Sequence, residues 1–188
     1  MARTALRIAL LAALSVSLTC TASVDAQHDS RALYKDIATY VGVRADVLYA
    51  IALAESGRRH ADTFAPWPWT LNIEGEARYY DDREAMFKAL MQALGEGKLR
   101  VDVGPMQVNW YWQQAQVSSP WRLTDPGTNL KLAAQILKQQ YQRSGDWRTA
   151  AGHYHRPFDN STEGQALAEQ YRQRVWRFLE QEAVRETP

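Results

Sequence analysis

Residues 47–57 of the chain have the sequence VLYAIALAESG, and the rest of the fold is organised around them. Read as a helix, this stretch places Leu48, Ile51 and Ala52 on one face. Glu55 lies on the same side, at three- and four-residue spacing from this apolar set. The stretch therefore predicts a buried helix with a carboxyl group in its last turn and with Gly57 just beyond to end it.

Glu55 is a candidate general acid because its expected setting disfavours the charged carboxylate. Apolar neighbours and the carbonyl end of a helix each raise the pKa of a carboxyl group. An acid that stays protonated near neutral pH can donate that proton to a leaving group. The alternative is a structural glutamate that turns to solvent or pairs with Arg58 or Arg59.

The first 26 residues predict a cleavable signal peptide. Arg3 and Arg7 precede an apolar core at residues 8–18, and small residues then lead to a cleavage site after Ala26. The core is too short to span a bilayer as a stable helix. A retained N-terminal anchor and lipidation of Cys20 are the alternatives. The segment before Cys20 fits a lipidation box poorly, so we expect this cysteine to be removed with the signal.

Residues 27–188 are expected to form one domain that buries a core without disulfides. The chain has 22 basic and 21 acidic residues; two arginines and one aspartate lie in the signal, which leaves 20 of each. The only cysteine is also lost, which excludes disulfides and thiol chemistry from this part. Zero net charge without a basic run argues against nucleic acid or an anionic membrane as the main partner.

Helical periodicity dominates the chain after the signal, which predicts a mainly α fold. Asp82, Asp125 and Asp146 are expected to cap three of the helices, and Thr162 with Gln165 fits a capping box for the last one. The expected helices cover residues 31–41, 44–56, 83–95, 126–143, 147–153 and 162–183.

Two stretches lack the helical pattern and are expected to form the walls of a cleft. In residues 64–80, two short segments around Gly75 predict a small hairpin that pairs residues 70–73 with 77–80. In residues 101–109, Gly104 followed by Pro105 predicts a turn.

Aromatic residues are concentrated in or beside these two stretches. Flat rings with polar tips suit the alternating CH faces and hydroxyls of a sugar, so the cluster indicates an extended glycan as the ligand. We include Trp69, and Asn72 in the same stretch, among the candidate sugar-binding residues. The aromatic set is Trp67, Trp69, Tyr79, Tyr80, Trp110, Tyr111 and Trp112.

Three motifs, in order and spacing, resemble those of lytic transglycosylases of the soluble-lytic-transglycosylase (SLT, lysozyme-like) type. They are AESG at residues 54–57, GPMQVN at 104–109 and AGHYH at 151–155. The resemblance covers residues 32–178 and is greatest to the small enzymes encoded with conjugation and type IV secretion machinery. It implies a lysozyme-like helical domain whose cleft is flanked by a small β-hairpin or irregular lobe. It also implies a peptidoglycan substrate, a periplasmic location, no cofactor and partners in a conjugation or secretion apparatus.

The resemblance also implies roles for individual residues. Glu55 matches the single catalytic acid/base of the family, and Tyr154 matches a tyrosine whose hydroxyl lies close to that glutamate. Pro105 stands where leucine is typical, His155 where asparagine is typical, and residues 100–103 where small residues are typical. These departures bear on sugar contacts more than on the chemistry. The residues implied to support the helix end or to contact the glycan are Ser56, Met106, Gln107, Asn109 and His155.

The implied reaction breaks the bond between N-acetylmuramic acid and N-acetylglucosamine and closes a 1,6-anhydro ring on the muramoyl unit. Glu55 is expected to protonate the leaving oxygen and then to accept a proton from the attacking C6 hydroxyl. A lysozyme-type hydrolase normally needs a second carboxylate, for which Glu74, Glu76 and Asp102 are candidates. A non-catalytic wall-binding scaffold is the third hypothesis.

A metal site is not expected. His60, His153 and His155 are the histidines considered. His153 and His155 point to different faces of a short helix, and no cysteine, aspartate or glutamate stands at ligand spacing beside these two.

Overall fold

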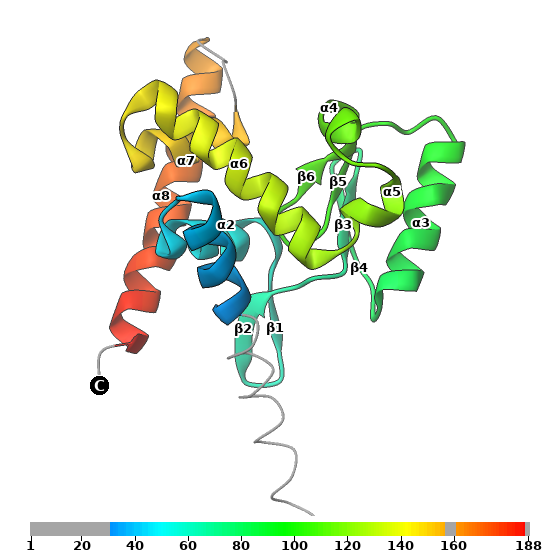
Figure 1. Ribbon diagram of the computed structural model, residues 1–188, viewed down its shortest axis with the longest axis horizontal. Helices are drawn as coiled ribbons and strands as arrows, with labels where there is room; N and C mark the ends of the chain where they lie inside the picture. The colour runs from blue at the N-terminus through cyan, green and yellow to red at the C-terminus, as the bar shows by residue number, and fades with distance from the viewer. Residues whose placement is uncertain (1–30, 157–160, 187–188) are drawn as a thin grey trace, which may run out of the picture.

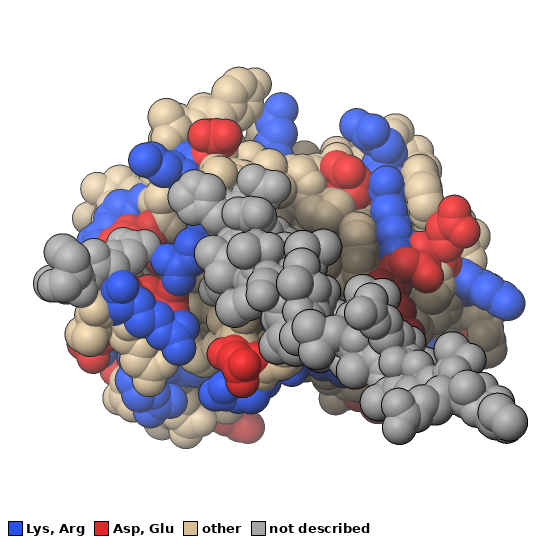
Figure 2. Space-filling model, turned by 90° about the horizontal axis from the view of Figure 1, so that it is seen from below, with Lys and Arg blue, Asp and Glu red and all other residues tan. Residues whose placement is uncertain are grey.

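The computed structural model describes residues 31–156 and 161–186, and shows a mainly α protein with a small β lobe (Figure 1). The fold class is therefore as the sequence predicts. The expected signal peptide, with Cys20 and its cleavage site, lies outside the described residues. Within those residues, no helix combines the length and apolar character needed to cross a membrane. Figure 2 shows Lys and Arg side chains mixed with Asp and Glu on one described face, in keeping with a formal net charge of +1.

The helical half of the molecule is built around α2 (Ala45–Ser56). Its residues 47–53 are all buried, because the helix is apolar on every side and is enclosed by its neighbours. It packs against α8 (Thr162–Glu186) and α7 (Trp147–His155), and α6 (Pro126–Ser144) packs along α7. A further helix at residues 31–41 precedes α2.

The β lobe is an antiparallel sheet with the strand order β4-β3-β5-β6. Its inner face is apolar and buried, as expected for alternating strands with one face on the core. Its strands are β3 (Thr70–Ile73), β4 (Glu76–Tyr79), β5 (Val101–Val103) and β6 (Val108–Asn109).

The opposite face of this sheet carries three polar residues side by side. Asn72 is the register partner of Asp102, and Asp102 is the register partner of Asn109. Directly opposite residues of neighbouring strands share a face, so the three side chains form a row across β3, β5 and β6. We call Asn72, Asp102 and Asn109 the polar row.

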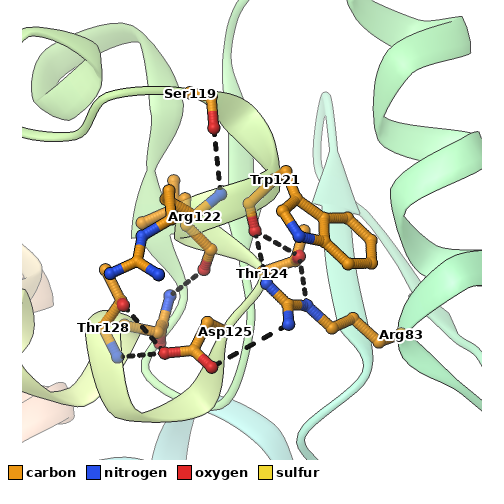
Figure 3. Close-up of polar contacts among 9 residues, drawn as sticks. Arg83, Ser119, Trp121, Arg122, Thr124, Asp125 and Thr128 are labelled. Atoms are coloured by element: carbon orange, nitrogen blue, oxygen red, sulfur yellow. Dashed lines mark hydrogen bonds and ion pairs between the residues drawn. The ribbon is translucent and has the colours of Figure 1, made fainter.

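Short helices and α3 (Arg83–Gly95) flank the sheet (Figure 1). Arg83, in the first turn of α3, fixes α5 (Pro120–Leu123) and the start of α6 (Figure 3). Its guanidinium donates to Thr124 Oγ1 at 2.9 Å and to the Trp121 carbonyl at 2.7 Å, and it lies 3.9 Å from the Trp121 ring centroid. Asp125, 3.9 Å from the same guanidinium, caps α6. These contacts join the β lobe to α6. In the chain, α4 (Trp110–Gln113) and η1 (Gln114–Gln116) connect β6 to α5.

The predicted helices all form, and three of the four predicted caps are confirmed. Asp82, Asp125 and Asp146 each accept a hydrogen bond from the backbone N–H three residues ahead, at 2.7–2.8 Å. The fourth prediction is wrong by one residue. Ser161 caps α8, since its hydroxyl accepts from the Gly164 N–H at 3.0 Å; the predicted cap, Thr162, is the first residue of the helix.

The predicted hairpin is confirmed as β3 and β4, but a second hairpin was not predicted. β1 (Gly57–His60) pairs with β2 (Thr63–Pro66) immediately after α2. Gly57 has φ −56°, so it does not end the helix through a left-handed conformation. A Cβ there would lie 2.2 Å from the Leu53 carbonyl oxygen and 2.5 Å from the Phe64 ring. Glycine is needed at this position for close packing.

Candidate active site

Glu55 lies in the last turn of α2, and its side chain is only 12 % exposed. Its Oε1 accepts a hydrogen bond of 2.6 Å from the hydroxyl of Tyr171 on α8. Burial raises the pKa of Tyr171 well above its ordinary value, so that hydroxyl keeps its proton and acts as the donor. Arg58, one of the two arginines considered as a partner for Glu55, instead lies over the ring of Trp67 at 4.8 Å.

Burial is also the largest influence on Glu55 itself, and it raises the pKa of this carboxyl to about 7. The hydrogen bond from Tyr171 and the positive charge of Arg174 lower this pKa, and Asp102 raises it. The direction expected from the sequence is therefore confirmed. A carboxyl group with this pKa is available near neutral pH both as an acid and, after losing its proton, as a base.

His155 lies beside this pair as a neutral ring. Its Nδ1 is 4.0 Å from Glu55 Oε1, and its ring stacks parallel to that of Tyr171 at 4.5 Å. Burial, with the charges of Arg174 and Arg156, lowers the pKa of His155 to about 4. At neutral pH, His155 and Glu55 therefore do not form an ion pair.

Glu55 opens into a cavity of about 750 Å³ that lies between the helical half and the β lobe. The helical half contributes Tyr154, His155, Arg156 and Arg174 to its lining. From the β lobe come the polar row (Asn72, Asp102 and Asn109), together with Tyr79, Gln107 and Trp112.

A second cavity of about 790 Å³ shares the polar row with the first. Its other lining residues include Glu74, Arg100 and Tyr111. Since Asn72, Asp102 and Asn109 line both cavities, the polar row forms their common wall. Together the cavities provide room for a ligand much longer than a single sugar.

Tyr154 is in the Glu55 cavity, as expected, but its hydroxyl has another acceptor. It donates to the Met106 carbonyl at 2.8 Å, and Tyr171 is the tyrosine that bonds Glu55. Tyr154 therefore shares the cavity with Glu55 but does not hydrogen-bond its carboxyl group. Helical periodicity can indicate that a residue such as Tyr171 is buried, but it does not indicate which polar atom the buried hydroxyl meets.

Ser56 and Met106, which were predicted among the glycan-binding residues, do not line the Glu55 cavity, whereas the expected role of Ser56 at the helix end agrees with its hydrogen bonds. Ser56 is 1 % exposed, and its hydroxyl lies 2.7 Å from the Pro105 carbonyl, which ties the end of α2 to the Gly104–Pro105 turn. The Met106 side chain is fully buried in the core. Gln107 does line the cavity, and it adopts a left-handed φ of +46°.

Asn129 on α6 holds the turn at residues 104–107 and was missed in the sequence. This fully buried side chain accepts from the Met106 N–H at 3.1 Å and donates to the Val103 carbonyl at 2.8 Å. Gly104 packs against it so closely that a Cβ would lie 2.8 Å from Asn129 Nδ2. The second turn of α6 therefore positions Gln107 at the cavity.

Some of the predicted aromatic residues line the two cavities, and others pack against the hydrophobic core. Trp69 was predicted to bind sugar, but it is partly buried against the core and does not line either cavity. Tyr79 and Trp112 line the Glu55 cavity with exposed fractions of 43 % and 69 %, and Tyr111 lines the second cavity.

Of the three carboxylates considered as partners of Glu55, only Asp102 shares its cavity. Asn109 Nδ2 donates to Asp102 Oδ1 at 2.7 Å, and burial raises the pKa of Asp102. Glu74 lines the second cavity, and Glu76 is exposed and pairs with Arg78 at 2.7 Å.

The histidines and carboxylates of the described residues do not form a metal-binding cluster. In the described part of the chain, no three His, Cys, Asp or Glu side chains are grouped so that they could hold a metal ion. The ring of His60 lies 5.6 Å from that of Trp67, between centroids.

Comparisons of the chain with protein-family models, with curated proteins and with solved structures find no significant match.

Proposed function

We propose that this protein is a lytic transglycosylase that cleaves the β-1,4 bond between N-acetylmuramic acid and N-acetylglucosamine in peptidoglycan. Glu55 supports this function most directly, because it is a buried carboxyl with a pKa near 7 that faces a cavity large enough for a glycan. The polar row and the exposed rings of Tyr79 and Trp112 offer the hydrogen bonds and flat faces that a sugar chain uses.

Glu55 acts twice in this reaction. It first gives its proton to the glycosidic oxygen as the bond to the anomeric carbon breaks. The carboxylate then takes the proton of the muramoyl C6 hydroxyl, whose oxygen attacks the anomeric carbon and closes the 1,6-anhydro ring. Tyr171 donates a hydrogen bond to the carboxylate, which stabilises the charged form between the two steps.

A hydrolase on the same site is the second candidate, and Asp102 is the observation that favours it. This carboxyl group lies in the Glu55 cavity, where a second carboxylate could activate water. A wall-binding scaffold remains as the third hypothesis, although a pure binder has no use for a carboxyl with a raised pKa.

The proposal extends to the setting of the reaction. The mature chain at residues 27–188 would act in the periplasm after removal of the signal peptide, and would open the wall locally for a conjugation or type IV secretion apparatus. The location follows from the predicted signal peptide, and the link to a transfer apparatus from the resemblance.

Mass spectrometry of the muropeptides released from purified peptidoglycan by residues 27–188 tests the function. Anhydro-muramoyl products that disappear with Glu55→Gln support the transglycosylase. Products with a reducing end would assign the protein as a hydrolase. Binding to peptidoglycan without any product would leave the scaffold.

A further inference from the structure

Two arginines line the helical end of the Glu55 cavity. Arg156 follows the end of α7, and Arg174 lies on α8 three residues after Tyr171. Residues three apart on a helix are neighbours, and the Arg174 guanidinium carbon lies 5.1 Å from the Tyr171 ring centroid. Arg174 is thus held beside the ring whose hydroxyl bonds Glu55.

The helical end of this cavity carries two cationic side chains, Arg156 and Arg174. Of the two carboxyl groups that line the cavity, Glu55 has a pKa that burial raises to about 7, and Asp102 lies on β5 of the sheet, where the Asn109 amide donates to it. Near neutral pH, the ring of His155 is uncharged. The charge of Arg174 reaches into the site, since it lowers the pKa of both Glu55 and His155. The corner formed by Arg156 and Arg174 therefore favours an anionic ligand.

We propose that Arg174, with Arg156 beside it, binds a carboxylate of the glycan at the sugar unit held against Glu55. The cavity would then select acid-bearing glycans over neutral glycans of the same linkage. A guanidinium can pair with a carboxylate through two parallel N–H···O bonds, which gives both affinity and orientation. This inference rests on the proposed function and adds to it the residues that recognise the acidic group of the substrate.

The carboxylate has two possible sources in peptidoglycan. One is the lactyl group of the muramoyl unit, which is free in strands that lack peptides. The other is the peptide stem, which carries carboxylates of its own. Both present the same chemistry to Arg174, and substrates with and without stems separate them.

Binding of a carboxylate at this corner also acts on Glu55. A bound anion offsets the charge of Arg174, which is one of the influences that lower the pKa of Glu55. The acid is therefore more fully protonated when the right substrate is in place.

The first test compares cleavage by wild type, Arg174→Gln and Arg177→Gln. Arg177 is an exposed residue on the same helix that does not line the cavity, so it controls for lost surface charge. The substrates are stem-free strands with free lactyl carboxylates, the same strands amidated with methylamine, and stem-bearing strands.

We expect wild type and Arg177→Gln to cleave an acid-bearing substrate with a kcat/KM about tenfold above that for amidated strands. Arg174→Gln should lose this preference, so that its kcat/KM becomes the same for acid-bearing and amidated strands. A loss confined to stem-free strands assigns the lactyl carboxylate, and one confined to stem-bearing strands assigns the stem. Equal losses on charged and amidated strands, or no loss on either, would overturn the proposal.

The second test measures binding without cleavage. In the Glu55→Gln protein, calorimetry compares a muramoyl tetrasaccharide with free carboxylates, its methylamide and a stem-bearing form. We expect about tenfold tighter binding of an acid-bearing form, lost when Arg174→Gln is added. This preference without cleavage by wild type would refute the proposed function and leave the carboxylate site standing. Cleavage by wild type with equal binding of all forms would refute the site alone.

Discussion

The two carboxyl groups that line the Glu55 cavity come from different secondary structures, one from a helix and the other from a sheet. Glu55 ends a helix that is apolar on every side, and it accepts a hydrogen bond from the hydroxyl of Tyr171. Asp102 stands in the middle of the polar row on the cavity face of a sheet, with the Asn109 amide as its donor. Burial raises the pKa of both, and for Glu55 it does so to about 7.

The difference shows how one cavity can contain two carboxyl groups with separate roles. A helix end enclosed by α8 and α7 leaves the Glu55 side chain only 12 % exposed, which favours its protonated form. The polar row supplies amide groups on both sides of Asp102, which suits a wall that hydrogen-bonds a ligand. Under the proposed function, proton transfer would fall to Glu55 and ligand contact to the polar row.

Removal of the Glu55 carboxyl should have the largest effect. We expect Glu55→Gln to lower the rate of glycan cleavage by about 10²–10⁴-fold, because the variant can neither donate nor accept the proton. Muropeptide release over time measures this, and the exposed carboxylate variant Glu76→Gln is the matched control. A rate within about tenfold of wild type would remove Glu55 from the chemistry.

The same substitution should stabilise the protein, but only at higher pH. The pKa of Glu55 is about 7 in the folded protein and 4.5 ordinarily, so the folded state binds more protons between these values. Stability is therefore lost as pH rises through this window, and glutamine avoids the loss. Urea unfolding should show Glu55→Gln more stable by about 3 kcal/mol at pH 8, and equal to wild type at pH 4. The same difference at both pH values would contradict the raised pKa.

Asp102→Asn separates the two carboxyl groups directly. If Asp102 only contacts the ligand, the rate should fall by less than about tenfold, and the products should remain anhydro-muramoyl species. Product mass spectra and initial rates measure both. A loss as large as that of Glu55→Gln, with reducing-end products in the wild type, would make Asp102 the second carboxylate of a hydrolase.

Tyr171→Phe should have the smallest effect and should act through pH. The Tyr171 hydroxyl lowers the pKa of Glu55, so loss of this hydroxyl raises that pKa. The fall in rate at high pH should therefore begin at a higher pH than in wild type. Tyr154→Phe is the matched control, because that hydroxyl bonds the Met106 carbonyl. If the fall in rate at high pH shifts in Tyr154→Phe but not in Tyr171→Phe, then Tyr154, and not Tyr171, is the tyrosine that acts on Glu55.

The sequence predicted those parts of the fold that depend on local patterns. Helix periodicity and capping aspartates located the helices to within a few residues, and the apolar run before Glu55 predicted both its burial and the rise in its pKa. The pairing of β3 with β4 followed from two short segments around Gly75. In each case the deciding residues lie close together in the chain.

The polar contacts between distant segments were not predictable in this way. Tyr171 and Glu55 are 116 positions apart, and Asn129 meets the turn at residues 104–107 from another helix. Periodicity shows that such residues are buried but not which atoms they meet. The partner of Ser56 is a further case, since its motif position suggests support of the helix end but does not reveal that its hydroxyl meets the Pro105 carbonyl.

The central claim is that Glu55 carries a proton near neutral pH, and a direct titration of its carboxyl carbon tests it best. Carbon-13 NMR of the protein labelled at glutamate side chains, with Glu55→Gln to assign the signal, gives the midpoint. We predict a midpoint at about pH 7 for the Glu55 carboxyl group. A midpoint near the ordinary value of 4.5 would contradict the claim and remove Glu55 as the acid at neutral pH.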